Sequence, residues 1–197
     1  VSTFNEDGTI NENFVNDNIT TGDGADVIRS GSGDDTISTG DGNDNIKAGS
    51  GDDTITGGEG RNSINAGDGD DTINITEGDG RADYEVVRGG EGTDTVVFEG
   101  NRADYEVSHE DNNGRFTVEN VETHEIQYIY DDVENIQFAD QTVSTFNEDG
   151  TINENFVNDN PNATDDSATT DEDTSITIDV LANDTDADSD KIGRASC

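Results

Sequence analysis

The sequence predicts an all-β fold, built as a flat coil of short parallel strands that stack on one another. The main observation is a Gly-x-Gly-x-Asp-x-Ile pattern that recurs every nine residues without a slip. Its six copies begin at Gly22, Gly31, Gly40, Gly49, Gly58 and Gly67. Residues 81–143 then alternate short runs of strand-forming residues with turns rich in Gly, Asn and Asp. Self-similarity at a fixed short period is the sequence signature of a solenoid, so we expect one here.

Each nine-residue unit divides into a glycine-rich turn and a short strand, because glycine tolerates the left-handed backbone angles of a tight turn. One isoleucine per unit is flanked by polar residues, which makes it the inward-facing side chain of its strand. These residues are Ile28, Ile37, Ile46, Ile55, Ile64 and Ile73. If two units make one turn of the coil, residues 18 apart lie on adjacent rungs. Asp26, Asp44 and Asn62 then line one edge, and Asp35, Asp53 and Asp71 line the other.

The composition is strongly acidic, with 48 Asp and Glu against 9 Lys and Arg and a formal net charge of −39. Such a chain repels nucleic acid and anionic membrane surfaces, so neither is an expected partner. No apolar stretch reaches the roughly 18 residues of a membrane span. A hydrophobic fraction of 27% with this charge is typical of a chain that does not fold unaided. Either most of the chain is an acidic solvated coil, or a cation completes the fold; the strict phase of the repeats favours the cation.

Stacked carboxylates require such a cation. Rungs about 4.8 Å apart place neighbouring carboxylates where they repel by roughly 3–4 kcal/mol at an effective dielectric of 20. One isoleucine per strand contributes about 1.5–3 kcal/mol and does not clearly offset both this and the ordering of many glycines. Carboxylates and turn carbonyls suit Ca²⁺ better than Mg²⁺, because Ca²⁺ tolerates irregular oxygen shells. Zinc fits poorly, since His109, His124 and Cys197 lie outside the repeats. We expect metal binding and folding to be one event.

The nine-residue units resemble the RTX (repeats-in-toxin) nonapeptide from Asp17 to Ile75, with an outlying copy, GEGTDTV, that begins at Gly90. The resemblance implies a right-handed parallel β-roll, a β-solenoid that binds several Ca²⁺ ions between successive turns. The implied carboxylate ligands are Asp26, Asp35, Asp44, Asp53 and Asp71. The implied carbonyl ligands belong to the turns of Gly22, Gly24, Gly31, Gly33, Gly40, Gly42, Gly49, Gly51, Gly67 and Gly69. Asp17, Asn62 and Asp94 are additional candidates.

The fifth copy departs from the pattern, with Arg61 and Asn62 where an aspartate is expected. We predict that the site between Asp44 and Asn62 is weak or empty, with the cation of Arg61 partly replacing the ion.

The expected organisation has six parts. Residues 1–18 form an N-terminal lead-in, 19–75 the β-roll, 76–143 a small β-rich cap of antiparallel type and 144–173 an acidic linker. Residues 174–190 are similar to the opening of the cadherin-like repeats of type I-secreted adhesins, and 191–197 resemble an added attachment tail. Residues 1–18 recur letter for letter at 143–160, either as a tandem array in a longer parent or as an introduced duplication.

The sequence carries no catalytic motif that we recognise, and His109-Glu110 and His124-Glu125 lack the second histidine of a metalloprotease helix. We therefore expect no enzyme. The expected function is a monomeric, calcium-binding structural module of a secreted or cell-surface adhesin, which folds on Ca²⁺ after export. The alternative is the C-terminal secretion domain of a protease, lipase or toxin. A remoter alternative is an ice- or surface-binding face, formed by Thr36, Ser38, Thr54, Thr56, Thr72 and Asn74.

Overall fold

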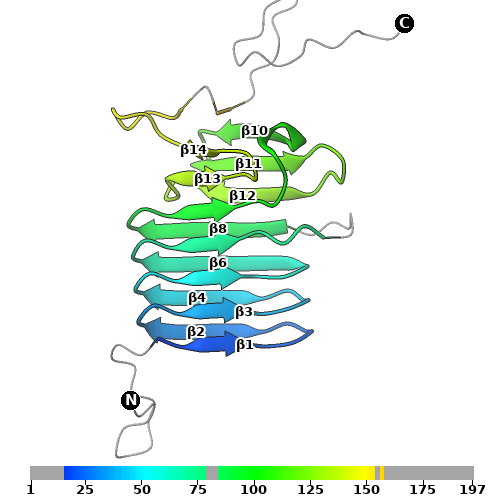
Figure 1. The fold of residues 1–197 in the computed structure, drawn as a ribbon, viewed down its shortest axis with the longest axis vertical. Coiled ribbons are helices and arrows are strands. Elements are labelled where there is room, and N and C mark those ends of the chain that lie inside the picture. Colours follow the sequence, from blue (N-terminus) through cyan, green and yellow to red (C-terminus); the bar gives the residue numbers. More distant parts are fainter. Residues whose placement is uncertain (1–15, 79–83, 154–155, 158–197) are drawn as a thin grey trace, which may run out of the picture.

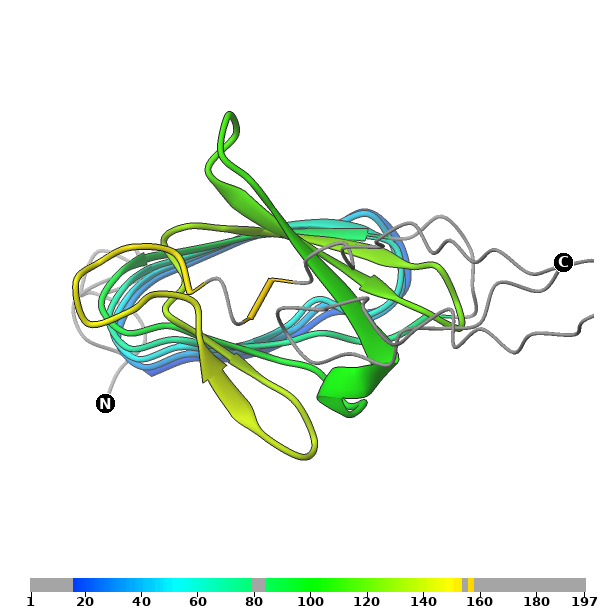
Figure 2. The same ribbon diagram turned by 90° about the horizontal axis from the view of Figure 1, so that it is seen from above.

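The computed structural model describes residues 16–78, 84–153 and 156–157, and it confirms the all-β class. Within these residues the one helical element is a single 3₁₀ turn, η1 (Arg102–Asp104). The strands form two sheets that face one another and together make a flattened coil (Figures 1 and 2). Successive rungs stack along the long axis, with β1 at one end and the β10–β14 region at the other (Figure 1).

The first sheet is made of short strands in the order β1-β3-β5-β7-β9-β13-β14. Their bounds are β1 (Asn18–Thr20), β3 (Thr36–Ser38), β5 (Thr54–Thr56), β7 (Thr72–Asn74), β9 (Thr95–Val97), β13 (Asn135–Gln137) and β14 (Thr142–Ser144). The second sheet has the order β10-β11-β12-β8-β6-β4-β2. Its strands are β2 (Val27–Ser32), β4 (Asn45–Ser50), β6 (Arg61–Asp68), β8 (Tyr84–Glu91), β10 (Tyr105–Glu110), β11 (Arg115–Asn120) and β12 (Ile126–Tyr130).

The register of the lower rungs follows the predicted offset of 18 residues. Ile28 pairs with Ile46 and Ile46 with Ile64 in the second sheet, and Ile37, Ile55 and Ile73 stack in the first. All six isoleucines are buried, since their strands alternate between buried and exposed side chains. The core of the coil is therefore two facing rows of β-branched residues, one contributed by each sheet.

The copy at Gly90 rejoins the stack after an insertion. β6 pairs with β8 in parallel, and Gly67 lies opposite Gly90, an offset of 23 residues. β7 pairs with β9, so that Val96 continues the row of Ile73. The first strands after residue 76 therefore extend the coil in parallel, whereas we expected them to open a separate antiparallel unit.

The cap adds one further rung before the chain turns antiparallel. β12 pairs in parallel with β8, and β13 pairs in parallel with β9. β10 and β11 then pair antiparallel on the outer side of β12, and β14 pairs antiparallel with β13. A buried aromatic cluster closes this end, comprising Phe98, Tyr105, Phe116, Phe138 and Phe156.

The cap extends beyond the boundary at residue 143. Thr145 is fully buried and Phe156 is 1% exposed, so this part of the expected acidic linker packs into the cap. The N-terminal lead-in up to residue 15, the rest of the linker from 158, the expected repeat at 174–190 and the tail at 191–197 lie outside the described residues.

Candidate metal centre

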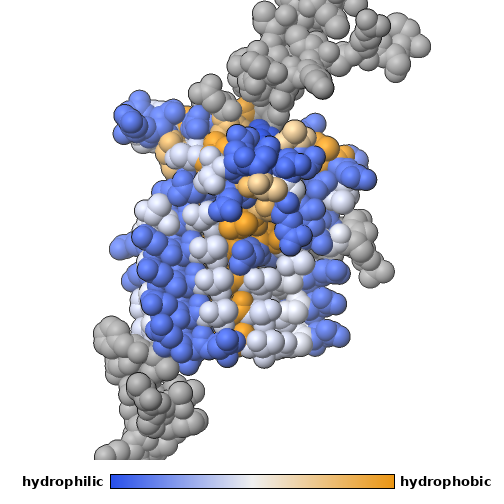
Figure 3. Space-filling model, viewed as in Figure 1, coloured by the Kyte–Doolittle hydropathy of each residue, from blue (hydrophilic) through white to orange (hydrophobic). Residues whose placement is uncertain are grey.

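Two rows of polar side chains run along the two edges of the coil, one residue per rung. The acid row immediately precedes the short strands and comprises Asp17, Asp35, Asp53, Asp71, Asp94 and Glu134. The mixed row lies at the starts of β2, β4, β6, β8 and β12 and comprises Asp26, Asp44, Asn62, Glu85 and Gln127. Hydrophilic surface follows both edges, with a paler band between them (Figure 3).

A hydrogen-bond ladder fixes each row. In the acid row, Oδ1 of Asp35 accepts the N–H of Asp17 at 2.7 Å, and Oδ1 of Asp53 accepts that of Asp35 at 2.7 Å. The same bond joins Asp53 to Asp71 at 2.7 Å and Asp71 to Asp94 at 2.9 Å. In the mixed row, Asp44 accepts from Asp26 at 2.8 Å. Each aspartate that accepts a ladder bond therefore uses one carboxylate oxygen for it, and the other is left for a second partner.

That second oxygen has no hydrogen-bond partner in the described structure. The set comprises the Oδ2 atoms of Asp26, Asp35, Asp44, Asp53, Asp71 and Asp94, all of them buried. Burial raises the pKa of Asp53 to about 6 and that of Asp71 to about 7 from 3.8, and neighbouring carboxylates add to the rise. Burial likewise raises the pKa of Asp94 to about 6. A buried carboxylate without a partner is costly, so these oxygens require a cation or a proton.

Asn62 shows what the unpartnered Oδ2 atoms face, because it is the one amide at the aspartate position of the six nonapeptide copies. Its Oδ1 accepts the N–H of Asp44 at 3.0 Å, as the aspartates do in the other rungs. Its Nδ2 donates to the carbonyls of Gly57 and Gly58, both at 3.0 Å. In an aspartate copy, Oδ2 replaces this nitrogen and the turn carbonyls cannot accept a hydrogen bond from it. A cation between carboxylate and carbonyl oxygens supplies the missing attraction.

The turns leave no room for other side chains beside these carbonyls. Gly49 has φ 131° and Gly67 has φ 129°, both in the region that favours glycine. A Cβ on Gly49 would lie 1.9 Å from the carbonyl oxygen of Gly31, and a Cβ on Gly67 would lie 1.9 Å from that of Gly49. The carbonyls of successive turns are thus stacked on each other at the edge, next to the aspartate row.

The donor set fits calcium. Among residues 16–78, 84–153 and 156–157, no three His, Cys, Asp or Glu side chains gather into a metal-binding group. An ion at either edge must therefore combine one or two carboxylates with backbone carbonyls. An all-oxygen shell of this kind is what Ca²⁺ takes, with bonds of about 2.3–2.6 Å and variable coordination.

Comparison with known families decides the nature of the repeats. The family model of the RTX calcium-binding nonapeptide repeat, which spans four copies, matches residues 15–46, 38–73 and 47–82. Residues 15–82 are RTX calcium-binding nonapeptide repeats. The cofactor of this RTX roll is Ca²⁺, and the number of copies indicates several ions. The chain is accordingly a calcium-binding structural module with a parallel β-roll at its centre.

A second family model, the bacterial Ig domain, matches residues 158–196. This segment lies outside the described residues and includes the part that we compared with a cadherin-like repeat. RTX repeats and Ig-like domains are structural families rather than catalytic ones. No curated protein matches the chain significantly. In the part of the chain that the structure describes, no helix is long and apolar enough to cross a membrane.

The structure brings the sequence-derived candidates together as two edges and adds members to both. Asp94 stacks directly above Asp71, and Glu134 continues the acid row above Asp94. We did not expect Glu85, Gln127 or Glu134 in these rows. Glu134 could have been found from the sequence, because Glu-Asn-Ile-Gln-Phe at 134–138 matches Asp-Thr-Val-Val-Phe at 94–98 in its acid, its inward-facing aliphatic residue and its phenylalanine. Arg61 differs from expectation, because its guanidinium lies over the ring of Tyr84 at 5.4 Å and the amide of Asn62 bonds the turn carbonyls.

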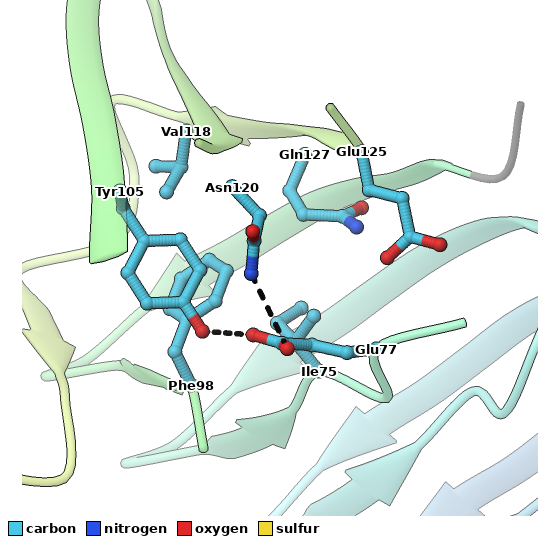
Figure 4. A pocket seen from close by; sticks show the side chains of 8 residues that line it. All are labelled: Ile75, Glu77, Phe98, Tyr105, Val118, Asn120, Glu125 and Gln127. Atoms are coloured by element: carbon cyan, nitrogen blue, oxygen red, sulfur yellow. Dashed lines mark hydrogen bonds between the residues drawn. The ribbon is translucent and has the colours of Figure 1, made fainter. Parts of the chain in front are cut away.

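A small hollow lies between the RTX roll and the cap, and Gln127 of the mixed row is one of its lining residues. It is lined by Ile75, Glu77, Phe98, Tyr105, Val118, Asn120, Glu125 and Gln127 (Figure 4). The carboxylate of Glu77 accepts bonds from the Tyr105 hydroxyl and from Asn120 Nδ2, the latter at 3.3 Å. The carboxylate of Glu125 accepts the N–H of Gly78 at 3.1 Å. These bonds tie the start of the inserted segment to the cap.

Proposed function

We propose that this module folds when it binds Ca²⁺ outside the cell, and that it serves as a rigid element in a larger secreted adhesin. The observation that carries the proposal is the row of buried Oδ2 atoms without partners. In the absence of a cation, each of these oxygens opposes folding, because its charge is removed from water and faces carbonyl oxygens. In the presence of Ca²⁺, the same oxygens become ligands.

The energetic argument makes calcium a condition of folding rather than an addition to a finished fold. Carboxylates on adjacent rungs repel by roughly 3–4 kcal/mol at an effective dielectric of 20. The repulsion energy summed over several such contacts in the acid row is comparable to a typical free energy of unfolding of about 5–15 kcal/mol. A chain that remains unfolded at low calcium is suited to export as an extended polypeptide. Extracellular calcium then drives folding after export, since ligand binding to the native state alone stabilises it.

Two features support an adhesin rather than a secreted enzyme as the parent. The RTX roll is followed by a match to a bacterial Ig domain, and both are structural families. The main rival remains the C-terminal secretion domain of a protease, lipase or toxin, and a catalytic domain in the same polypeptide would favour that rival. We place the module at the cell surface or in the extracellular medium, as a monomer joined to neighbouring domains.

A second candidate function rests on the exposed face of the short-strand sheet. Thr36, Thr54, Thr72 and Thr95 lie in one column, and Ser38, Thr56 and Asn74 in the next. A regular hydroxyl array of this kind is a candidate ice- or surface-binding face. Inhibition of ice recrystallisation by the calcium-loaded chain tests it, and Thr54→Tyr is the variant expected to abolish any such activity.

Far-UV circular dichroism of the chain in EGTA, titrated with Ca²⁺ and separately with Mg²⁺, tests the main proposal. We expect a cooperative change from coil to β-structure with Ca²⁺ but not with Mg²⁺ at the same concentrations. A spectrum that is β-rich in EGTA and unchanged by Ca²⁺ would show that the hydrophobic rows and the cap suffice, and would overturn calcium-dependent folding.

A further inference from the structure

The RTX roll is open at the end where β1 and β2 lie (Figure 1). These are the edge strands of the two sheets, and within residues 16–78, 84–153 and 156–157 no strand pairs with their outer sides. Ile28 of β2 is 8% exposed, whereas Ile46 and Ile64 above it are each 1% exposed. Val27, beside Ile28, is 61% exposed. An unpaired edge and the exposed end of an apolar row are surfaces that solenoid proteins cover, so the first rung is suited to an occupant.

The opposite end of the coil is closed by the cap, and residues 143–157 are part of it as far as the structure describes them. The carbonyl oxygen of Phe156 accepts a hydrogen bond from Nη2 of Arg102 at 2.8 Å. The ring of Phe156 lies 5.6 Å from that of Phe116, measured between centroids. Val157 packs against the same hydrophobic core. The segment therefore belongs to the interior of the cap up to its last described residue.

The same sequence stands directly before the first rung of the roll. Residues 1–18 and 143–160 are identical, so the residue that corresponds to Val157 immediately precedes Asn16. Asn16 already belongs to the roll, because its Oδ1 accepts the N–H of Asp34, one rung above, at 2.9 Å. In the repeated sequence, the last residue that packs in a cap and the first residue of an RTX rung are therefore neighbours, with no linker between them.

Peptide geometry then limits where a cap can lie when it precedes a roll. Adjacent Cα atoms are about 3.8 Å apart across a trans peptide, and neighbouring strands of a sheet are about 4.8 Å apart. A cap that is completed by residues 1–15 consequently ends within about one strand spacing of the first rung. The nearest unpaired surface at that point is the open end formed by β1 and β2.

We propose that the open first rung of the RTX roll is a docking surface for the cap of a second copy of this chain. Copies joined through the repeated segment then form one continuous coil, in which β14 of one copy faces β1 of the next and β10 faces β2, because these are the edge strands of the same two sheets. This inference rests on the proposed function and deepens it, since it makes the joint between copies as rigid as the module itself. A contact of this head-to-tail kind extends from copy to copy without closing.

The test uses a tandem chain in which residues 1–142 are fused directly before the complete chain. Residues 1–18 of the second copy then stand where residues 143–160 stand in the single chain. One control is the single chain, and the other carries a long Gly/Ser linker between residues 15 and 16 of the second copy, which keeps both sequences and removes the restraint on distance. Hydrogen exchange with mass spectrometry in Ca²⁺ follows residues 18–32, which contain β1 and β2.

We expect residues 18–32 to exchange as one population in the single chain and in the linker control. In the tandem chain the same peptide occurs twice, and its isotope distribution should split into two populations of equal intensity, one unchanged and one that exchanges more slowly. Small-angle X-ray scattering should show one rigid rod for the tandem chain and two independently moving bodies for the linker control.

A single population in the tandem chain, with the exchange rate of the single chain, would overturn the docking of the cap on the first rung. Residues 45–74 are the internal reference for this result, because they lie inside the roll. Their equal protection in the tandem and single chains shows that both rolls have folded. If residues 45–74 gain no protection from Ca²⁺ in any of the three chains, the proposed calcium-dependent folding fails instead.

Discussion

Replacement of Asp71 by asparagine separates the cost of the free carboxylate from its use as a calcium ligand. Asp71 is 1% exposed, and its Oδ2 has no hydrogen-bond partner in the described structure. In Asp71→Asn the corresponding amide can donate to the turn carbonyls, as Asn62 donates to those of Gly57 and Gly58. We therefore expect the calcium-free form to become more stable and the calcium-bound form to lose stability and ions.

The magnitude follows from the pKa. Burial, opposed by the bond from the Asp53 N–H, raises the pKa of Asp71 from 3.8 to about 7. A folded-state pKa above the unfolded value means that folding is penalised as pH rises from about 4, and that the penalty is complete above about 7. Each pKa unit corresponds to 1.36 kcal/mol, so the penalty at pH 8 is at most about 4 kcal/mol. We expect Asp71→Asn to recover about 2–4 kcal/mol of it.

The assay is folding induced by trimethylamine N-oxide in EGTA at pH 8, because an excluded osmolyte favours the compact state without any ion. Asp71→Asn should fold at a lower osmolyte concentration than the wild type. Asp68→Asn is the matched control, an exposed acid of the same turn with the same loss of charge. If Asp71→Asn requires as much osmolyte as Asp68→Asn, the Oδ2 atom of Asp71 is not an unpaired charge and the argument for the ion fails.

Three further predictions test other parts of the structure. Asn62→Asp should raise the number of bound Ca²⁺ ions and weaken the fold in EGTA, which calorimetric titration and osmolyte-induced folding would measure; an unchanged ion count would contradict a site on the mixed row. Burial raises the pKa of Glu85 from 4.5 to about 8, so stability should fall as pH rises between these values. Glu85→Gln should remove that dependence in thermal unfolding from pH 5 to 9, and a wild-type slope that persists would refute the assignment. Gly49→Ala should cost more than about 2 kcal/mol in calcium, because φ is 131° and the methyl group meets the Gly31 carbonyl; a urea midpoint equal to that of the wild type would contradict the turn geometry.

The nine-residue period made the lower rungs predictable. It determines both which residues share an edge and which side chains face inward, so Asp35, Asp53 and Asp71 could be stacked from spacing alone. The period could not place the residues of the rungs above, because the insertion changes the offset from 18 to 23 residues between Asp71 and Asp94. Glu134 and Gln127 lie farther still along the chain, and neither is followed by glycine turns of the repeat type.

The role of Asn62 illustrates why side-chain chemistry was harder to predict than position. The sequence identified the departure from aspartate and suggested that the adjacent Arg61 supplies the cation. The structure instead satisfies two turn carbonyls through the amide of Asn62. Which of two neighbouring donors reaches the carbonyls depends on the alternation of side chains along the strand, since Asn62 is buried at 1% exposure and Arg61 faces outward in β6.

The two edges of the coil differ in what holds them together. In its upper rungs the mixed row consists of Asn62, Glu85 and Gln127, and burial keeps Glu85 uncharged below about pH 8. The acid row carries a carboxylate on every rung from Asp17 to Glu134. Withdrawal of calcium therefore leaves unbalanced charge along the whole acid row, whereas on the mixed row it leaves such charge only at the lower rungs, at Asp26 and Asp44. The acid row is therefore the edge that depends on calcium along its entire length, and the dependence of the mixed row on calcium decreases toward the cap.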